Sequence, residues 1–327
     1  MTTCLGLEST AHTLSAGIVD DTGRILGVVN DTYVPDEGGL HPLKTSNHHV
    51  DCFQSVIEKV LDQARIALKA IDVIAFSQGP GLGPCLRVGA SVARALAAFL
   101  GVPIVGVNHC VAHVEIGRLV CKVDDPLTLY VSGGNTIVSA FDCGRYQVFG
   151  ETLDIALGNL LDAFAREAGL QHPGGPKIEA LARESTTYIE LPYTVKGMDL
   201  ALSGLLTSAT NALRNHPVAD VAFSLQETAF SMVAEVTERA LAHTEKKDVL
   251  VTGGVAANGR LQEMIRLISE DHGASFHAVP RALAGDNGAM IAWTGLLQFK
   301  HAGSLSMEKT SIMPKWRLDQ VPIAWRS

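Results

Sequence analysis

The sequence predicts an α/β protein with two similar lobes and a cleft between them. The first observation is a repeated order of strand, polar turn, strand, Asp-x-Gly-Arg turn and strand, over 4–29 and again over 128–150. The same turn chemistry occurs in both copies, at 21–24 and 142–145, which indicates a duplicated β-meander. The second observation is that strands alternate with helices after the first copy, as in a mixed sheet with crossover connections.

Length and composition suit this architecture. The chain has 327 residues, enough for two domains, which we expect at 1–126 and 127–327 with an insertion around 184–217. The net charge of −8 argues against a protein that coats nucleic acid by bulk electrostatics. Six scattered cysteines without a C-x-x-C pair indicate a reduced, cytoplasmic protein.

Hydrophobic periodicity gives the elements of the first half. Apolar spacing predicts a helix over 44–69, and an apolar run predicts a buried strand over 72–76. A loop rich in Gly and Pro follows, then an Ala-rich helix over 86–100 and a strand over 103–108. The apolar stretch 88–107 contains Arg94, Gly101 and Pro103, so we do not expect it to span a membrane.

The second half continues in the same alternating way. Four helices are predicted in it, over 155–170, 177–183, 219–244 and 260–269. A short apolar strand at 249–252 precedes the last of them. We expect 184–217 to be an irregular inserted piece.

A hairpin around Ser132-Gly133-Gly134-Asn135 lies at the start of the second meander. Two adjacent glycines can adopt positive φ, which would let several N–H groups point at one anion such as a phosphate. An ordinary tight hairpin is the alternative that the turn alone leaves open.

Two histidines, His109 and His113, are four residues apart on a predicted helix. This spacing places both imidazoles on one face, close enough to bind one metal ion, although such pairs also occur on ordinary helices. The zinc-protease pattern needs Glu directly after the first His, and here Cys110 stands there. A metalloprotease is therefore not expected.

Two further loops are candidates for chemistry. Residues 253–258, Gly-Gly-Val-Ala-Ala-Asn, lie between a strand and a helix, where a nucleotide could approach the backbone closely. This loop is not G-x-G-x-x-G, and the sequence contains no P-loop motif. Asp286 lies just before an apolar helix and is either an N-cap or a site carboxylate.

Four motifs together resemble the tRNA threonylcarbamoyladenosine synthesis family, also called the TsaD or O-sialoglycoprotein endopeptidase-like family. They are Asn-His-Cys-Val-Ala-His at 108–113, Tyr-Val-Ser-Gly-Gly at 130–134, His-Pro-Gly-Gly-Pro-Lys-Ile-Glu at 172–179 and Thr-Gly-Gly-Val-Ala-Ala-Asn at 252–258. The resemblance covers nearly the whole chain and implies the two-lobed actin-like, Hsp70-like ATPase (ASKHA) fold. The chain departs from the family pattern at 43–46, Leu-Lys-Thr-Ser.

The resemblance also implies a metal and a nucleotide site. The metal, usually iron and with zinc as the alternative, would be held by His109, His113, Tyr130 and Asp286. An adenine nucleotide, threonylcarbamoyl-AMP or ATP, would contact Tyr130, Val131, Ser132, Gly133, Gly134, Asp162, Gly175, Glu179 and Asn258. Histidine, phenolate and carboxylate ligands suit such a metal.

The activity implied by the resemblance is a metal-dependent acyl transfer. The threonylcarbamoyl group of threonylcarbamoyl-AMP would pass to N6 of the adenosine 3′ of the anticodon in tRNAs that read codons beginning with adenine. The Cys-Val-Ala-His-Val-Glu variant resembles the archaeal and eukaryotic branch, which works in the cytoplasm with a small kinase and other KEOPS subunits. The alternatives are an ATPase or sugar-kinase-like phosphotransferase on the same fold and a non-catalytic scaffold subunit.

Overall fold

The computed structural model describes residues 2–35 and 39–326, and its chain forms two compact units. The first unit comprises Met1–Leu119, Asp142–Tyr146 and Asp286–Ser327, and the second comprises Val120–Phe141 and Gln147–Gly285. The sequence-based boundary between 126 and 127 falls where β6 begins. Contacts nevertheless group the last segment, 286–327, with the first unit, because α10 packs on the sheet of that unit.

The first unit is built around a five-stranded mixed sheet of order β3-β2-β1-β4-β5. The three strands of the meander are antiparallel, and β4 and β5 add to β1 in parallel. The strands are β1 (Thr3–Glu8), β2 (Thr13–Asp20), β3 (Ile25–Thr32), β4 (Val73–Gly79) and β5 (Ile104–Asn108). The helices are α1 (Pro42–Ala64), α2 (Gly83–Leu100), α3 (His109–Cys121) and α10 (Gly288–Ala302). Short 3-10 turns lie at Leu68–Ala70, Met307–Lys309 and Leu318–Gln320.

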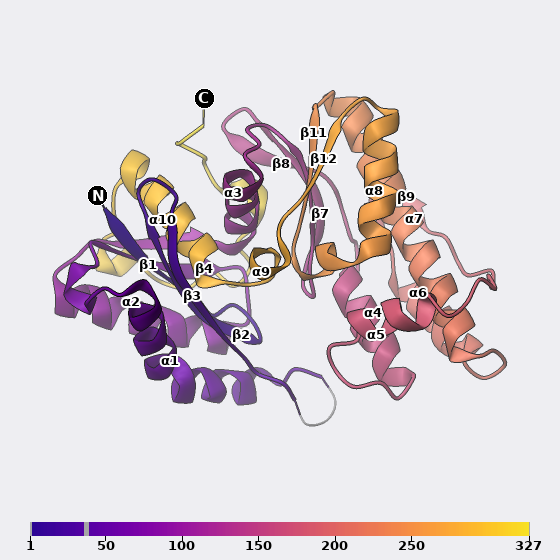
Figure 1. The fold of residues 1–327 in the computed structure, drawn as a ribbon, viewed down its shortest axis with the longest axis horizontal. Coiled ribbons are helices and arrows are strands. Elements are labelled where there is room, and N and C mark those ends of the chain that lie inside the picture. The colour runs from indigo at the N-terminus through magenta and orange to yellow at the C-terminus, as the bar shows by residue number, and fades with distance from the viewer. Residues whose placement is uncertain (1, 36–38, 327) are drawn as a thin grey trace. The chain divides into compact units, whose positions relative to one another are not determined.

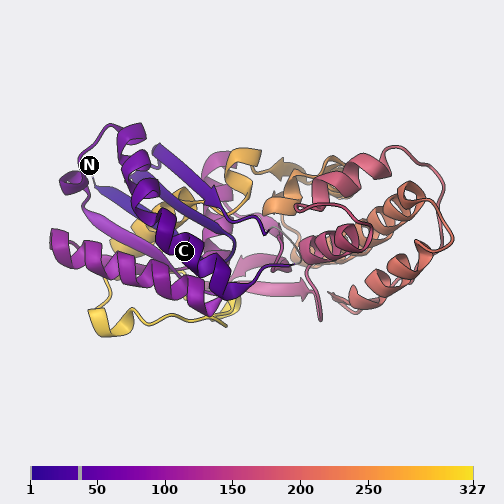
Figure 2. The same cartoon turned by 90° about the horizontal axis from the view of Figure 1, so that it is seen from below.

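Helices cover both faces of this sheet (Figures 1 and 2). Leu5 and Leu7 of β1 lie in one core with apolar residues of α1 and α2. Successive side chains of a strand point to opposite faces, so Gly6 faces the other way, where a Cβ atom would overlap the backbone of α10. The sheet therefore carries α1 and α2 on one face and α10 on the other.

One helix of the described residues, α2, is long and apolar enough by length and composition to cross a membrane. Its buried residues include Leu86, Ala90, Ala93 and Ala97. The last three belong to the apolar core on the face shared with α1. One face of the helix therefore packs in the core of the first unit.

The second unit repeats the topology of the first. Its sheet has the order β12-β11-β6-β7-β8, in which β6 and β7 are antiparallel and β11 and β12 add to β6 in parallel. The strands are β6 (Leu127–Val131), β7 (Thr136–Asp142), β8 (Arg145–Glu151), β11 (Asp248–Thr252) and β12 (Ser275–Ala278). The equivalent order of the two sheets confirms the predicted duplication of the meander.

Five helices of this unit share one apolar core with β6, β7 and β11. They are α4 (Leu157–Glu167), α5 (Gly175–Ala182), α6 (Ser203–Ala212), α7 (Val218–Thr244) and α8 (Gly259–Asp271). Shorter elements are β9 (Val195–Lys196), β10 (Asp199–Leu200), the 3-10 turn η2 (Gly254–Ala257) and α9 (Arg281–Ala284). The stretch 184–217 is more regular than expected, because α6 buries Leu205 and Ala209 in this core.

Helix boundaries differ from the sequence-based ones by a few residues. The helix expected over 44–69 begins earlier, with Pro42 in its first turn, and ends at Arg65, which has a left-handed conformation. A proline in the first turn lacks only an N–H that would find no partner there, and a left-handed residue commonly ends a helix.

Candidate functional site

The two helix histidines lie in the first turns of α3, directly after β5. Asn108 ends the strand, and its Oδ1 accepts the N–H groups of Cys110 and Val111 at 3.0 and 3.1 Å, which starts the helix at His109. The ring centroids of His109 and His113 are 4.8 Å apart, with the ring planes at 83°. The four-residue spacing therefore brings both imidazoles together, as predicted.

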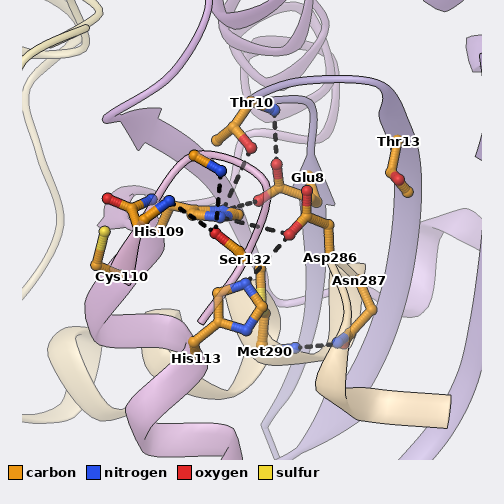
Figure 3. A network of polar contacts seen from close by, with 12 residues as sticks. Glu8, Thr10, Thr13, His109, Cys110, His113, Ser132, Asp286, Asn287 and Met290 are labelled. Carbon is orange, nitrogen blue, oxygen red and sulfur yellow. Dashed lines mark hydrogen bonds and ion pairs between the residues drawn. The ribbon is translucent and has the colours of Figure 1, made fainter. Parts of the chain in front are cut away.

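Asp286 joins this pair from the other end of the chain (Figure 3). Its Oδ1 lies 3.2 Å from Nε2 of His113 and 3.5 Å from Nε2 of His109. The N-cap of α10 is the next residue, Asn287, whose Oδ1 accepts the N–H of Met290 at 3.0 Å. Asp286 is thus not the helix cap, and its carboxylate faces the histidines instead.

Close backbone packing holds Asp286 in this position. A Cβ atom on Gly17 of β2 would overlap the backbone of α10, and one on Gly288 would overlap the backbone of β2. The N–H of Gly288 also donates to the Ser15 hydroxyl at 2.8 Å. The start of α10 is therefore fixed against the sheet, two residues after the carboxylate.

Glu8 at the end of β1 was not predicted as a site residue, yet it contacts His109 directly. Its Oε2 lies 2.9 Å from Nδ1 of His109, and its Oε1 accepts the N–H of Thr10 at 2.6 Å. The Glu8 side chain is fully buried. A carboxylate bonded to one nitrogen of a histidine directs the other nitrogen toward a metal and makes it a stronger ligand.

The charges in this cluster shift the pKa values of its members. Burial lowers the pKa of His109, but Glu8 and Asp286 outweigh it and raise that pKa to about 9. Burial would raise the pKa of Asp286, but the two histidines hold it well below its usual range. Burial lowers the pKa of His113 despite its bond to Asp286. Without a metal, His109 is therefore the protonated member.

The three groups could hold one metal ion. A nitrogen from each histidine and a carboxylate oxygen of Asp286 lie within 4.8 Å of one another, and two imidazoles with one carboxylate are common ligands of iron and zinc. This donor set fits the predicted metal. The fourth predicted ligand, Tyr130, lies on β6 in the second unit and pairs with Ile137 and Thr252, and its role as a ligand stays a prediction.

The Gly-Gly turn between β6 and β7 differs from the expected conformation. Neither Gly133 nor Gly134 has positive φ. The turn is closed by a 2.8 Å hydrogen bond from the Ser132 N–H to the Asn135 carbonyl. The Ser132 hydroxyl accepts the N–H groups of Gly134 and Asn135, so two of the N–H groups that were expected to face an anion are bonded within the turn.

A glycine outside the turn, Gly158, allows α4 to pack closely against it, whereas Gly133 and Gly134 of the turn itself border open space. A Cβ atom on Gly158, at the start of α4, would overlap the Ser132–Gly133 peptide, and the N–H of Gly158 donates to the Ser132 carbonyl at 3.1 Å. Apart from its chain neighbours, no atom of the described residues lies within 4 Å of a Cβ atom placed on Gly133 or on Gly134. Space is therefore available above the turn in this unit.

The other predicted nucleotide residues lie on α4, α5 and the loop before α8. Asp162 accepts the N–H of Gly174 at 2.7 Å, and Glu179 accepts the N–H of Gly259 at 3.0 Å. Asn258 caps α8 by accepting two N–H groups and is 7% exposed. These side chains therefore shape the loops of the second unit, and their contact with a nucleotide stays a prediction, as it does for Val131 and Gly175.

The adjacent glycines at the end of β11 have different surroundings. Gly253 has φ of +97°, and a Cβ atom there would overlap the carbonyl of Val131. Within the part of the chain that the structure describes, and apart from the adjoining backbone, no atom lies within 4 Å of a Cβ atom placed on Gly254. Gly253 is thus required by the fold, whereas the protein leaves the space beside Gly254 open.

Comparison with known proteins gives a family. A family model described as tRNA N6-adenosine threonylcarbamoyltransferase matches residues 25–293. The tRNA N6-adenosine threonylcarbamoyltransferase of Methanococcoides burtonii is 54% identical over 328 residues, which cover 99% of this chain and 98% of the relative. A probable bifunctional tRNA threonylcarbamoyladenosine biosynthesis protein of Methanothermobacter thermautotrophicus is 53% identical over 98% of this chain, which spans 60% of that longer relative.

A solved structure supports the fold independently of sequence similarity. The (R)-2-hydroxyglutaryl-CoA dehydratase component A of Acidaminococcus fermentans aligns with a TM-score of 0.59 at 14% identity, over 90% of this chain and 98% of that one. Similarity at this identity concerns the fold alone. It confirms the predicted actin-like α/β architecture.

Proposed function

Since the chain belongs to the tRNA N6-adenosine threonylcarbamoyltransferase family, we propose that it transfers a threonylcarbamoyl group from threonylcarbamoyl-AMP to tRNA. The acceptor is N6 of the adenosine 3′ of the anticodon in tRNAs that read codons beginning with adenine. The amine forms a bond to the carbamoyl carbon and loses a proton, and the bond from that carbon to the phosphate oxygen breaks as AMP leaves. The observation that carries this proposal is the cluster of His109, His113 and Asp286, with Glu8 behind it.

The proposed metal site consists of His109, His113, Asp286 and Tyr130, with iron as the favoured metal and zinc as the alternative. When bound, such an ion supplies a Lewis acid that can polarise a carbonyl or phosphoryl oxygen. Glu8 accepts a hydrogen bond from the Nδ1–H of His109 and so keeps the Nε2 lone pair of the metal-binding state directed at the site. The buried position of both histidines limits the access of water to that lone pair.

The adenylate is proposed to bind to the second unit. Its phosphate would lie on the turn at 132–135, whose conformation is fixed by the Ser132 hydroxyl. Its nucleoside would lie over Gly254 and near Asp162 and Glu179, whose carboxylates are suitable acceptors for ribose hydroxyls. Support comes from the open space at Gly133 and Gly254, since residues 2–35 and 39–326 place no atom beyond the adjoining residues within 4 Å of a Cβ at either position.

A phosphotransferase on the same fold would use a different donor set. Phosphoryl transfer needs Mg²⁺, which prefers oxygen ligands and is commonly held by carboxylates and phosphates. The clustered histidines His109 and His113 are poor ligands for that ion. The geometry therefore favours acyl transfer over phosphoryl transfer.

Partner subunits are part of the proposal. We infer that the chain works in the cytoplasm with a small kinase and other subunits of a KEOPS-type assembly. The bifunctional name of the longer relatives supports an association with a second activity. The net charge of −8 also favours partners that supply cationic contacts to tRNA.

His109→Ala tests the proposed function. In a reaction that contains the partner subunits, threonine, bicarbonate, ATP and tRNA, this variant should lower the rate of threonylcarbamoyladenosine formation at least about 100-fold, because one ligand and its Glu8 partner are lost. Mass spectrometry of the nucleosides measures the product, and fluorescence of a labelled adenylate measures nucleotide binding, which should be retained.

The control for this experiment is His272→Ala. His272 pairs with Glu238 at 3.1 Å on the surface of the second unit and belongs to no proposed site. This variant should keep the full rate. A His109→Ala protein that made threonylcarbamoyladenosine at the unsubstituted rate would contradict the proposed role of the cluster.

A further inference from the structure

A second cluster of metal-binding side chains lies in the first unit, on elements that the proposed reaction does not use. Asp31 is the penultimate residue of β3, and His48 and Cys52 lie on α1. One ligand atom from each of the three lies within 4.8 Å of the others. His48 and Cys52 are four residues apart, so α1 presents both on one face.

Hydrogen bonds orient the His48 ring. Nε2 of His49 lies 2.9 Å from the carbonyl oxygen of Ala11, which can only accept, so this nitrogen donates. His49 is fully buried, and burial favours the neutral imidazole, so its Nδ1 carries a lone pair. Nδ1 of His48 lies 3.3 Å from that atom and therefore donates to it. The other nitrogen of His48, Nε2, then faces Oδ1 of Asp31 at 3.0 Å.

Two states of His48 satisfy this arrangement. A protonated His48 forms an ion pair with Asp31, and the thiol of Cys52, whose pKa is raised by burial, also bonds to that carboxylate. A neutral His48 directs a lone pair at a carboxylate oxygen, which is stable only with a cation between them. Cys52 then completes a set of one nitrogen, one oxygen and one sulfur.

We propose that Asp31, His48 and Cys52 bind a divalent transition-metal ion such as Zn²⁺. Imidazole, thiolate and carboxylate are the usual protein ligands of zinc, whereas Mg²⁺ and Ca²⁺ select sites of oxygen ligands. All three residues are half-buried, so an ion can enter from solvent. Three protein ligands leave a fourth position for water or for a group of a bound partner.

Cobalt distinguishes this site from the histidine cluster of α3. A thiolate ligand gives Co²⁺ an intense sulfur-to-metal charge-transfer band in the near ultraviolet, and the ligand group of His109, His113 and Asp286 contains no thiol. The full chain, stripped of metal with a chelator and titrated with Co²⁺, should develop this band. Excess Zn²⁺ should remove it by displacing the cobalt.

Substitutions assign the band to the proposed ligands. Cys52→Ser should remove the band, and His48→Gln and Asp31→Asn should each weaken Co²⁺ binding at least about tenfold, because the loss of a ligand costs at least as much as the loss of a residue behind it. Circular dichroism checks that each variant is folded. Should Cys52→Ser not fold, the two other variants still test the site.

The matched control is Cys143→Ser. Cys143 is an exposed thiol 3.4 Å from the carboxylate of Asp142, so its removal tests whether any surface thiol beside an acid gives the band. Both this variant and His109→Ala should keep the band and the affinity. Absence of the band from the unsubstituted chain, or a band that survives Cys52→Ser, would overturn the proposal and leave His48 and Asp31 as an ion pair.

Discussion

At the scale of single residues, Glu8 belongs to the candidate metal site although it lies in none of the sequence motifs. The histidine pair was predicted from its four-residue spacing, and Asp286 from the family resemblance, because both signals are local in the sequence. The Glu8 carboxylate lies at the end of a buried strand, where the neighbouring leucines give no indication of its partner. Its contact with His109 joins residues 101 positions apart, and only the pairing of β1 with β4 and of β4 with β5 brings them together.

Glu8→Gln should weaken metal binding while the fold is kept. The glutamine oxygen can still accept from Nδ1 of His109, but the negative charge that strengthens this ligand is lost, so we expect a 10- to 100-fold rise in the dissociation constant, roughly, as for other residues behind a metal ligand. Calorimetric titration with Zn²⁺ measures it. Added metal should restore activity, which a purely structural defect would not allow.

The control for Glu8→Gln is the same substitution at Glu58, which lies on the surface of α1 and bonds to Gln54. Its metal affinity should equal that of the unsubstituted chain. Equal affinities for all three proteins would show that Glu8 has no influence on the site.

The raised pKa of His109 predicts how metal binding depends on pH. In the metal-free chain this pKa is about 9, so near neutral pH one proton must leave before Nε2 can bind a metal. The pKa of His113 is lowered and that of Asp286 lies well below its usual range, so neither has a proton to release. Metal affinity should therefore rise at least about tenfold per pH unit up to about pH 9, and more steeply if the proposed ligand Tyr130 also releases its phenolic proton on binding. Titrations at several pH values measure the slope, and a flat profile would contradict the protonated state of His109.

At the scale of the elements, the sequence predicted type and order better than conformation. The repeated order of strands and polar turns, with an Asp-x-Gly-Arg turn in each copy, predicted both meanders, since these signals act within a few residues. The predicted conformation of the turn at 132–135 was wrong. Gly133 and Gly134 do not have positive φ, and the Ser132 hydroxyl accepts two of the N–H groups of the turn. The close packing of Gly6 and Gly17 against α10 depends on partners about 270 to 290 residues away, which no local pattern reveals.

The loop between β11 and α8 offers a matched pair of variants. Gly254→Val should fold, since its side chain enters open space, but should weaken adenylate binding at least about tenfold if the nucleoside lies there. Gly253→Val should lower the melting temperature strongly, because of the φ of +97° and the overlap with Val131. Thermal denaturation and fluorescence of a labelled adenylate measure the two effects. Unchanged nucleotide affinity in a folded Gly254→Val protein would contradict the proposed placement.

At the scale of the whole molecule, the duplication accounts for much of what the sequence revealed. The two sheets have equivalent strand orders, and in each of them helices connect the parallel strands. The repeated turn chemistry was therefore enough to predict the architecture. The assignment of 286–327 to the second half differs from the observed grouping, since α10 returns to the first sheet. A return of this kind is a long-range contact, and composition does not change at its boundary.

The charge of the whole chain predicts how it binds tRNA. Affinity for nucleic acid grows with the number of phosphates that Lys and Arg neutralise, and each one adds to the dependence on salt. The chain has 26 Lys and Arg against 34 Asp and Glu, so alone it should bind tRNA with a dissociation constant of roughly 10⁻⁴ to 10⁻⁶ M and a shallow salt dependence. Partner subunits should tighten binding and steepen this dependence, because they add phosphate contacts. Fluorescence anisotropy with labelled tRNA at several salt concentrations measures both quantities. Nanomolar binding by the chain alone, with full modification in the absence of partners, would show that this chain carries the whole tRNA-binding surface itself.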